Sequence, residues 1–194
     1  MVSIDDIQKL REETKAPVME CKKALEKAQG DTKKAKEILR KQGEIRAEKK
    51  QGVNTKAGII EAYIHSNKQV GVLLELRCET DFVAKNPDFK DLAHDLAMQV
   101  AATKPLFVSE KNVPQEIIEK KKKDYEEELE KEGKPKEILE KIITGKLEKD
   151  FEEMCLEKQK FIKDESKNVG DLVKEAVAKF GEKIEIGEFA RFQI

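Results

Sequence analysis

The side chains that usually carry catalytic chemistry are scarce in this chain. His65 and His94 are the two histidines among 194 residues, and neither belongs to a known catalytic or metal-binding motif. The three cysteines lie far apart, at Cys21, Cys78 and Cys155, which predicts free thiols instead of a disulfide framework or a zinc site. We therefore expect no bound metal, no cofactor and no enzymatic reaction.

Motifs for nucleotide binding and for hydrolysis are absent as well. The sequence has no GxxxxGK[ST] or GxGxxG pattern, so the chain itself is not expected to hold a nucleotide phosphate. It also has no GxSxG or HExxH pattern. The basic run Lys120–Lys123 lies between acidic residues without interleaved aromatic residues, which favours a charged helix surface over direct nucleic-acid binding.

One short stretch, ETDFVAKN at residues 79–86, is suited to recognition. It follows the most apolar run of the chain, Val70–Leu76, which predicts a buried strand. Phe82 then stands beside Asp81 where the strand ends, just before the breaker Asn86-Pro87. From the residues alone two interpretations stay open: Phe82 closes the hydrophobic core, or it is an exposed anchor that enters a pocket of a partner.

The elements that position this stretch are expected to form an α+β fold in two domains, residues 1–52 and 53–194. The sequence of the first domain predicts three short helices: Ser3 caps the first, Pro17 opens the second and Asp31 caps the third. A polar helical linker from Glu44 to Gln51 is expected to follow. Their apolar stripes are Ile4, Ile7 and Leu10, then Val18, Cys21, Ala24, Leu25 and Ala28, then Ala35, Ile38 and Leu39.

The second domain predicts an antiparallel sheet covered by helices. Runs at residues 59–64 and 70–76 with a turn at residues 66–68 predict a hairpin, whose second strand is apolar on both faces and therefore central. A helix to about Thr103, a helix at residues 169–180 and a strand in the tail complete it. Residues 114–160 predict a charged protrusion of short helices, broken at Gly133-Lys134-Pro135 and at Gly145.

Charge is unevenly distributed along the chain, although the net charge is −1. Residues 1–56 contain 15 Lys and Arg against 10 Asp and Glu, a net charge of +5, whereas residues 57–194 carry −6, which suggests two regions with different partners. No run of 18 apolar residues predicts a membrane span, and the N-terminus has the features of neither a signal nor a transit peptide. We expect a cytoplasmic protein that does not contact the membrane.

Over essentially its whole length the chain resembles one known family. The segments LREETKAPVMECKKALEKAQGD, ELRCETDFVAKNPDFKDLAHDLAMQVA and VGDLVKEAVAKFGEKIEIGEFARF, in this order, are similar to bacterial elongation factor Ts. Members of this family are guanine-nucleotide exchange factors for elongation factor Tu. The resemblance implies this partner and a UBA-like fold for the three N-terminal helices.

The resemblance also implies roles for particular residues. The motif matching Asp81 and Phe82, flanked by Thr80 and Val83, inserts into the nucleotide-binding domain of elongation factor Tu beside its magnesium and phosphate sites. Lys15 stands where the family usually has Gly, and a single visible copy of the core implies a homodimer. The expected contacts of the N-terminal module with the partner are Leu10, Arg11, Thr14, Lys22 and Lys23.

An alternative interpretation does not depend on the resemblance. In it, a basic three-helix module binds RNA or the ribosome and is joined to a dimerising α+β domain. Salt dependence distinguishes the two interpretations, because binding through phosphate contacts weakens steeply as salt rises, whereas binding through a hydrophobic anchor does not.

Overall fold

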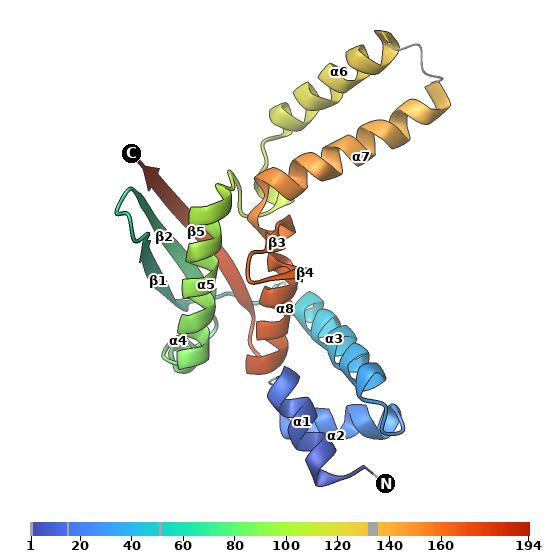
Figure 1. The fold of residues 1–194 in the computed structure, drawn as a ribbon, viewed down its shortest axis with the longest axis vertical. Helices are drawn as coiled ribbons and strands as arrows, with labels where there is room; N and C mark the ends of the chain where they lie inside the picture. Colours follow the sequence, from blue (N-terminus) through green and yellow to red (C-terminus); the bar gives the residue numbers. More distant parts are fainter. Residues whose placement is uncertain (1, 15, 51, 132–135) are drawn as a thin grey trace. The chain divides into compact units, whose positions relative to one another are not determined.

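The computed structural model describes residues 2–14, 16–50, 52–131 and 136–194 (Figure 1). The backbone divides into two compact units. Unit 1 comprises Met1–Glu61, Glu75–Ala93 and Asp171–Gly187, and unit 2 comprises Ala62–Leu74, His94–Gly170 and Glu188–Ile194. The predicted α+β class is confirmed, because α-helices are combined with a three-stranded antiparallel sheet.

Three helices at the start of unit 1 share a hydrophobic core of their own. They are α1 (Ile4–Thr14), α2 (Val18–Lys27) and α3 (Thr32–Lys49). Both predicted side-chain caps are confirmed, since Ser3 Oγ accepts from the Asp6 N–H and Asp31 Oδ1 accepts from the Lys34 N–H, each at 3.1 Å. The buried residues of this core are Leu10, Ala16, Cys21, Ala24, Leu25, Ala28, Ala35 and Leu39.

Helix α3 is longer than the sequence pattern predicted. The run from Glu44 continues α3 to Lys49 and does not form a separate linker. Gly43, just before this run, has a low helix propensity, but a single glycine does not interrupt the helix. Gly43 instead permits close packing against α8 (Val169–Phe180), since a Cβ at Gly43 would lie only 2.9 Å from Ala178 Cβ. Lys15 and Gln51 lie outside the described residues.

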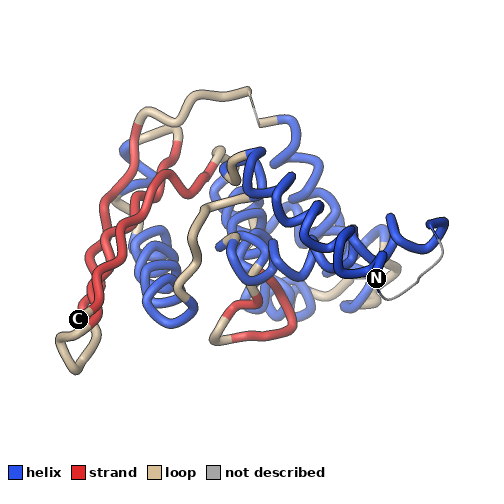
Figure 2. The backbone as a smooth tube through the Cα atoms, turned by 90° about the horizontal axis from the view of Figure 1, so that it is seen from above, coloured by secondary structure: helices blue, strands red, loops and turns tan. Residues whose placement is uncertain are grey.

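The sheet contains β1 (Ala57–Ile64), β2 (Val70–Cys78) and β5 (Ile184–Gln193) in the order β1-β2-β5. The predicted hairpin is confirmed, because the His65 N–H donates to the Val70 carbonyl at 2.9 Å across the turn. The Ile194 N–H donates to the Gln69 carbonyl at 3.0 Å, so the C-terminus lies beside this turn (Figure 1, Figure 2). As predicted, β2 is the central strand.

The two faces of β2 differ, which corrects the prediction that both are buried. Val72, Leu74, Leu76 and Cys78 are buried, and these alternate residues share one face because side chains repeat every two residues along a strand. Leu73 on the other face is half-exposed, and Glu75 and Arg77 follow it there as a charged pair. The sheet therefore has a covered face and an open one.

Helix α5 (Pro87–Thr103) follows the predicted helix closely. Its second half lies against the strand segments of unit 2. There the rings of His94 and Tyr63 pack edge to face with their centroids 5.6 Å apart, and the Ala101 carbonyl accepts a hydrogen bond from the Arg191 guanidinium at 3.2 Å. Its first half belongs to unit 1, where Phe89 packs edge to face against Phe180 at the end of α8, with ring centroids 6.2 Å apart.

The charged segment of unit 2 forms a pair of antiparallel helices, α6 (Gln115–Lys131) and α7 (Lys136–Met154) (Figure 1). Its apolar seam contains Leu129, Leu139, Ile143 and Leu147. The predicted break at Gly145 is wrong, because the seam residues on both sides of it keep α7 continuous. The other predicted break, Gly133-Lys134-Pro135, lies outside the described residues.

Polar contacts flank this seam. Tyr125 Oη donates to Asp150 Oδ2 at 2.7 Å, and this hydrogen bond raises the pKa of Tyr125 to about 12. Lys146 Nζ lies 2.6 Å from Glu128 Oε2, so ion pairing also links the two helices.

Four short elements of unit 2 are absent from the sequence prediction. They are β3 (Lys160–Phe161), β4 (Asp164–Asn168) and the 3-10 turns η1 (Glu110–Asn112) and η2 (Leu156–Lys158). They are too short to show a periodic pattern. A buried side chain holds the β3–β4 hairpin, because Gln99 donates to the Lys160 carbonyl at 3.0 Å and accepts from the Ile162 N–H at 2.9 Å.

Candidate functional site

The stretch after β2 forms a single helical turn, α4 (Asp81–Ala84). Thr80 is its N-cap, with an extended backbone and a hydroxyl oxygen 3.5 Å from the Val83 N–H. Val83 and Ala84 are buried, so they fix the inner side of the turn. Asp81 and Phe82 lie on the outer side, because consecutive helical residues point in different directions.

Phe82 is 82% exposed, which excludes the interpretation that it closes the hydrophobic core. The contrast with Phe89, seven residues later, is informative, because Phe89 is fully buried against Phe180. Phe82 is thus an exposed aromatic ring on a short capped turn, beside an exposed carboxylate.

The residues just before the turn are fixed by hydrogen bonds from other parts of unit 1. The Glu79 carboxylate accepts from Lys50 Nζ and from the Lys183 N–H, each at 2.5 Å. These two contacts, that of Lys50 first, hold the pKa of Glu79 below its usual value of 4.5. The Glu182 carboxylate accepts from the Thr80 hydroxyl at 2.6 Å and from the Thr80 N–H at 3.0 Å.

The thiol of Cys78 supports the loop from inside. Its Sγ donates to the Thr80 carbonyl at 3.2 Å, and burial raises the pKa of this thiol. Burial favours the neutral form of the thiol, so Cys78 has a structural role and is not a reactive nucleophile.

The predicted contact residues of the N-terminal module differ in accessibility. Arg11, Lys22 and Lys23 are exposed. Leu10 is fully buried in the three-helix core, and the hydroxyl of half-buried Thr14 donates to the Leu10 carbonyl at 2.7 Å. The structure therefore places three of these five side chains on the surface and two inside the module.

Two apolar residues of this module lie on the surface, which the sequence pattern did not predict. Val18, predicted to lie in the apolar stripe of the second helix, is 46% exposed, and its neighbour Met19 is 60% exposed. Both stand at the start of α2, where Pro17 opens the helix. A methionine outside the helical period of the stripe was the available signal for an exposed apolar patch.

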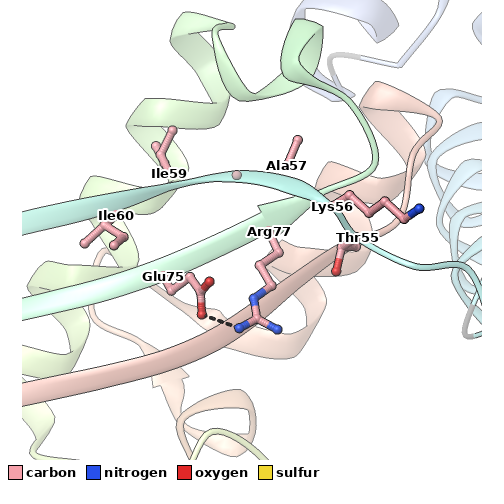
Figure 3. Close-up of a pocket in the computed structure, with 8 residues that line it drawn as sticks. Thr55, Lys56, Ala57, Ile59, Ile60, Glu75 and Arg77 are labelled. Carbon is pink, nitrogen blue, oxygen red and sulfur yellow. Dashed lines mark hydrogen bonds and ion pairs between the residues drawn. The ribbon is translucent and has the colours of Figure 1, made fainter.

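A small hollow of about 210 Å³ opens beside β1 and β2 in unit 1 (Figure 3). On β2, Arg77 Nη2 donates to Glu75 Oε2 at 2.7 Å, so these two charges are paired with each other. Small-molecule sites are usually larger, about 300 Å³ or more, so the hollow does not indicate a substrate site. Its lining residues are Thr55, Lys56, Ala57, Gly58, Ile59, Ile60, Glu75 and Arg77.

Within the described residues, no cluster of three His, Cys, Asp or Glu side chains has a geometry that could hold a metal ion. No helix among the described segments is long and apolar enough to cross a membrane.

Known proteins resemble this chain over its full length. A family model described as Elongation factor TS matches residues 4–194. Elongation factor Ts of Thermotoga maritima is 54% identical over 193 residues, which covers 100% of this chain and 96% of the relative. The corresponding protein of Thermosipho melanesiensis is 52% identical over 194 residues (100% and 99%), and that of Moorella thermoacetica is 48% identical over 194 residues (100% and 96%).

Proposed function

This chain belongs to the elongation factor Ts family of translation elongation factors, and from that premise we propose that it binds GDP-bound elongation factor Tu and promotes the release of GDP. The exchange makes and breaks no covalent bond, so the chain acts as an exchange factor and not as an enzyme. Its place of action is the cytoplasm, where elongation factor Tu works.

The exposed ring of Phe82 is the observation that carries this proposal. Burying a phenylalanine side chain in a partner contributes about 1.5 to 3 kcal/mol, and Phe82 has most of its surface still available. Asp81 beside it supplies a directional polar contact that sets the register. Together they enter the nucleotide-binding domain of elongation factor Tu next to its magnesium and phosphate sites.

Insertion of Phe82 favours a conformation of the partner that holds magnesium and GDP weakly. A thousandfold faster release requires the barrier to fall by about 4 kcal/mol, of which the ring supplies a substantial part. The coupling is reciprocal: a factor that weakens GDP binding is itself bound more weakly when GDP is present, so entry of fresh nucleotide releases it.

The N-terminal module makes the second contact in this proposal. Val18 and Met19 form an exposed apolar pair, and Arg11, Lys22 and Lys23 are exposed cations of the same module. Lys22 and Lys23 lie one helical turn after Val18 and Met19 on α2, so this apolar pair has cations beside it and fits an acidic surface of the partner. The buried Leu10 and the inward-bonded Thr14 act from inside, by fixing the packing of α1 on α2.

We also propose that the open face of the sheet forms a homodimer interface. In unit 2, Tyr63 and Arg191 point toward α5, so the alternate residues Ile64 and Phe192 point away from it. Ile64 is 64% exposed and Phe192 is 68% exposed. Covering these apolar side chains with the same face of a second copy removes them from water.

Comparing binding to two forms of elongation factor Tu tests the proposed function. By reciprocity the chain binds nucleotide-free elongation factor Tu more tightly than the GDP-bound form, and titration calorimetry measures both affinities. Equal affinities would contradict it. Titrating the chain against RNA at low and high salt tests the RNA- or ribosome-binding alternative, which requires tight binding that weakens steeply as salt rises.

A further inference from the structure

The turn between α8 and β5 holds the loop that carries Phe82. This turn contains Gly181, whose φ of 71° suits glycine, then Glu182 and Lys183. Glu182 lies 102 residues from Thr80 along the chain, yet each of its carboxylate oxygens accepts a hydrogen bond from Thr80, one from the hydroxyl and one from the N–H. These are charge-assisted bonds, the stronger class of hydrogen bond.

Each of the two bonds fixes a different property of Thr80. The hydroxyl bond, at 2.6 Å, points the Thr80 hydroxyl proton toward Glu182 and leaves an oxygen lone pair for the Val83 N–H, as an N-cap requires. The bond to the Thr80 N–H, at 3.0 Å, fixes the backbone plane at the point where the chain enters α4. Glu182 thus orients the cap as well as the peptide before it.

Helix α4 depends on such external support because it has only four residues. A single turn is not stable by itself, since the cost of nucleating a helix is not recovered over so few hydrogen bonds. Val83 and Ala84 hold its inner side in the core, but the direction of Phe82 depends on how the turn is rotated about them. The hydrogen bonds that hold the N-cap residue Thr80 set this rotation of α4.

The turn between α8 and β5 also fixes Glu79, the residue before Thr80. Lys183 presents its backbone N–H to the Glu79 carboxylate, which also accepts from Lys50, the residue that follows α3. Glu182 therefore holds Thr80, and its neighbour Lys183 holds Glu79. This arrangement is stiffer than one contact, because sliding of the loop would break three hydrogen bonds together.

We propose that Glu182 is a positioning residue for nucleotide exchange: its carboxylate fixes Thr80 and thereby directs Phe82 toward the partner. This inference rests on the proposed function, since it assigns the residue that prepares the same site. Glu182 acts through Thr80 and Phe82, and it does not itself enter the partner.

The test combines Glu182→Ala and Glu182→Gln with Phe82→Ala in a double-mutant cycle. A suitable control is Glu165→Ala, which removes the same charge from an exposed position on β4. For each full-length variant, the rate of release of fluorescent GDP from elongation factor Tu is measured against factor concentration. This gives a maximal rate and a half-saturating concentration, and the melting temperature is recorded separately.

With Phe82 present, Glu182→Ala lowers the maximal rate by about tenfold, which corresponds to the lower end of what one charge-assisted hydrogen bond contributes. The half-saturating concentration changes less than about twofold, since the N-terminal module still docks. Glu182→Gln, whose amide keeps one acceptor, has an intermediate effect. In the Phe82→Ala background, Glu182→Ala has no further effect, because there is no ring left to direct.

Three results overturn the inference. One is a maximal rate of Glu182→Ala equal to that of Glu165→Ala. Another is an equal loss in both backgrounds, which would mean that Glu182 acts independently of Phe82. The third is a large fall in melting temperature with a normal rate per folded molecule. Two other results would overturn the proposed function itself: a wild-type chain that does not accelerate GDP release, or a Phe82→Ala chain with a normal rate. These results differ from the three above, so failure of the proposed function can be told apart from failure of the inference about Glu182.

Discussion

Replacing Phe82 by alanine separates folding from partner binding, because the same motif contains a matched buried residue, Phe89. Phe82 is 82% exposed and Phe89 is fully buried. The two substitutions remove the same atoms from positions seven residues apart. Their effects on stability and on exchange are therefore expected to be opposite.

The expected cost to folding follows from the covered area. About one fifth of the Phe82 side chain is covered, so Phe82→Ala lowers the free energy of unfolding by less than about 0.5 kcal/mol. Phe89→Ala leaves a cavity against Phe180 and costs about 3 to 5 kcal/mol. For a chain of this length the second change lowers the melting temperature by at least about 6 °C, whereas the first leaves it nearly unchanged.

The expected cost to exchange has the opposite order. Loss of a central interface anchor removes about 2 kcal/mol or more from the transition state, which slows exchange about thirtyfold. The assay is stopped-flow release of fluorescent GDP from elongation factor Tu, with rates normalised to the folded fraction. At temperatures where it is folded, Phe89→Ala is expected to retain most of the wild-type rate.

A large fall in melting temperature for Phe82→Ala, with normal exchange per folded molecule, would refute this reasoning. It would mean that the ring stabilises the fold and that the exposed conformation of the loop is not the one that matters. A milder loss of exchange is expected for Asp81→Ala, whose contact is polar and more easily replaced by water.

Three other outcomes are expected. A fragment of residues 1–52 folds on its own by circular dichroism, because its apolar core uses only its own helices, and the remaining chain stays folded but binds elongation factor Tu more weakly. Ile64→Glu converts the homodimer to a folded monomer in sedimentation, since it places a charge on the open face of the sheet; an unchanged dimer would exclude that face. The pKa of Glu79 is lower in the folded chain than in the unfolded chain, so the ionised carboxylate stabilises the fold above about pH 4.5. This stabilisation is lost as the pH falls through the folded-state pKa. In denaturant titrations, the difference in the free energy of unfolding between wild type and Glu79→Gln is therefore expected to shrink between pH 7 and about pH 3.

Much of the fold could be predicted because its longer elements bury regular stripes. The continuous apolar run Val70–Leu76 identified the central strand, although only one of its faces is buried, and the repeat from Phe89 to Val100 identified α5. The same reasoning failed at Gly145, where packing between α6 and α7 outweighs the low helix propensity of one glycine. It also missed β3 and β4, whose pairing depends on the buried side chain of Gln99.

The candidate site was predictable only in part. The sequence located Phe82 but left open whether it was buried, because exposure depends on which side of a one-turn helix faces the core. Helical spacing placed Leu10 in the core, and the structure agrees, although the family resemblance implied a direct contact. Glu182 had no local signal at all, since its partner Thr80 is 102 residues away.

The most direct test of the central claim is whether this chain, in catalytic amounts, exchanges nucleotide on elongation factor Tu. Elongation factor Tu loaded with fluorescent GDP is mixed with excess unlabelled GDP and a small fraction of an equivalent of the chain. One molecule of the chain is expected to empty many molecules of elongation factor Tu, and the rate of release is expected to rise in proportion to the concentration of the chain. Release at the spontaneous rate, with the chain shown to be folded, would contradict it.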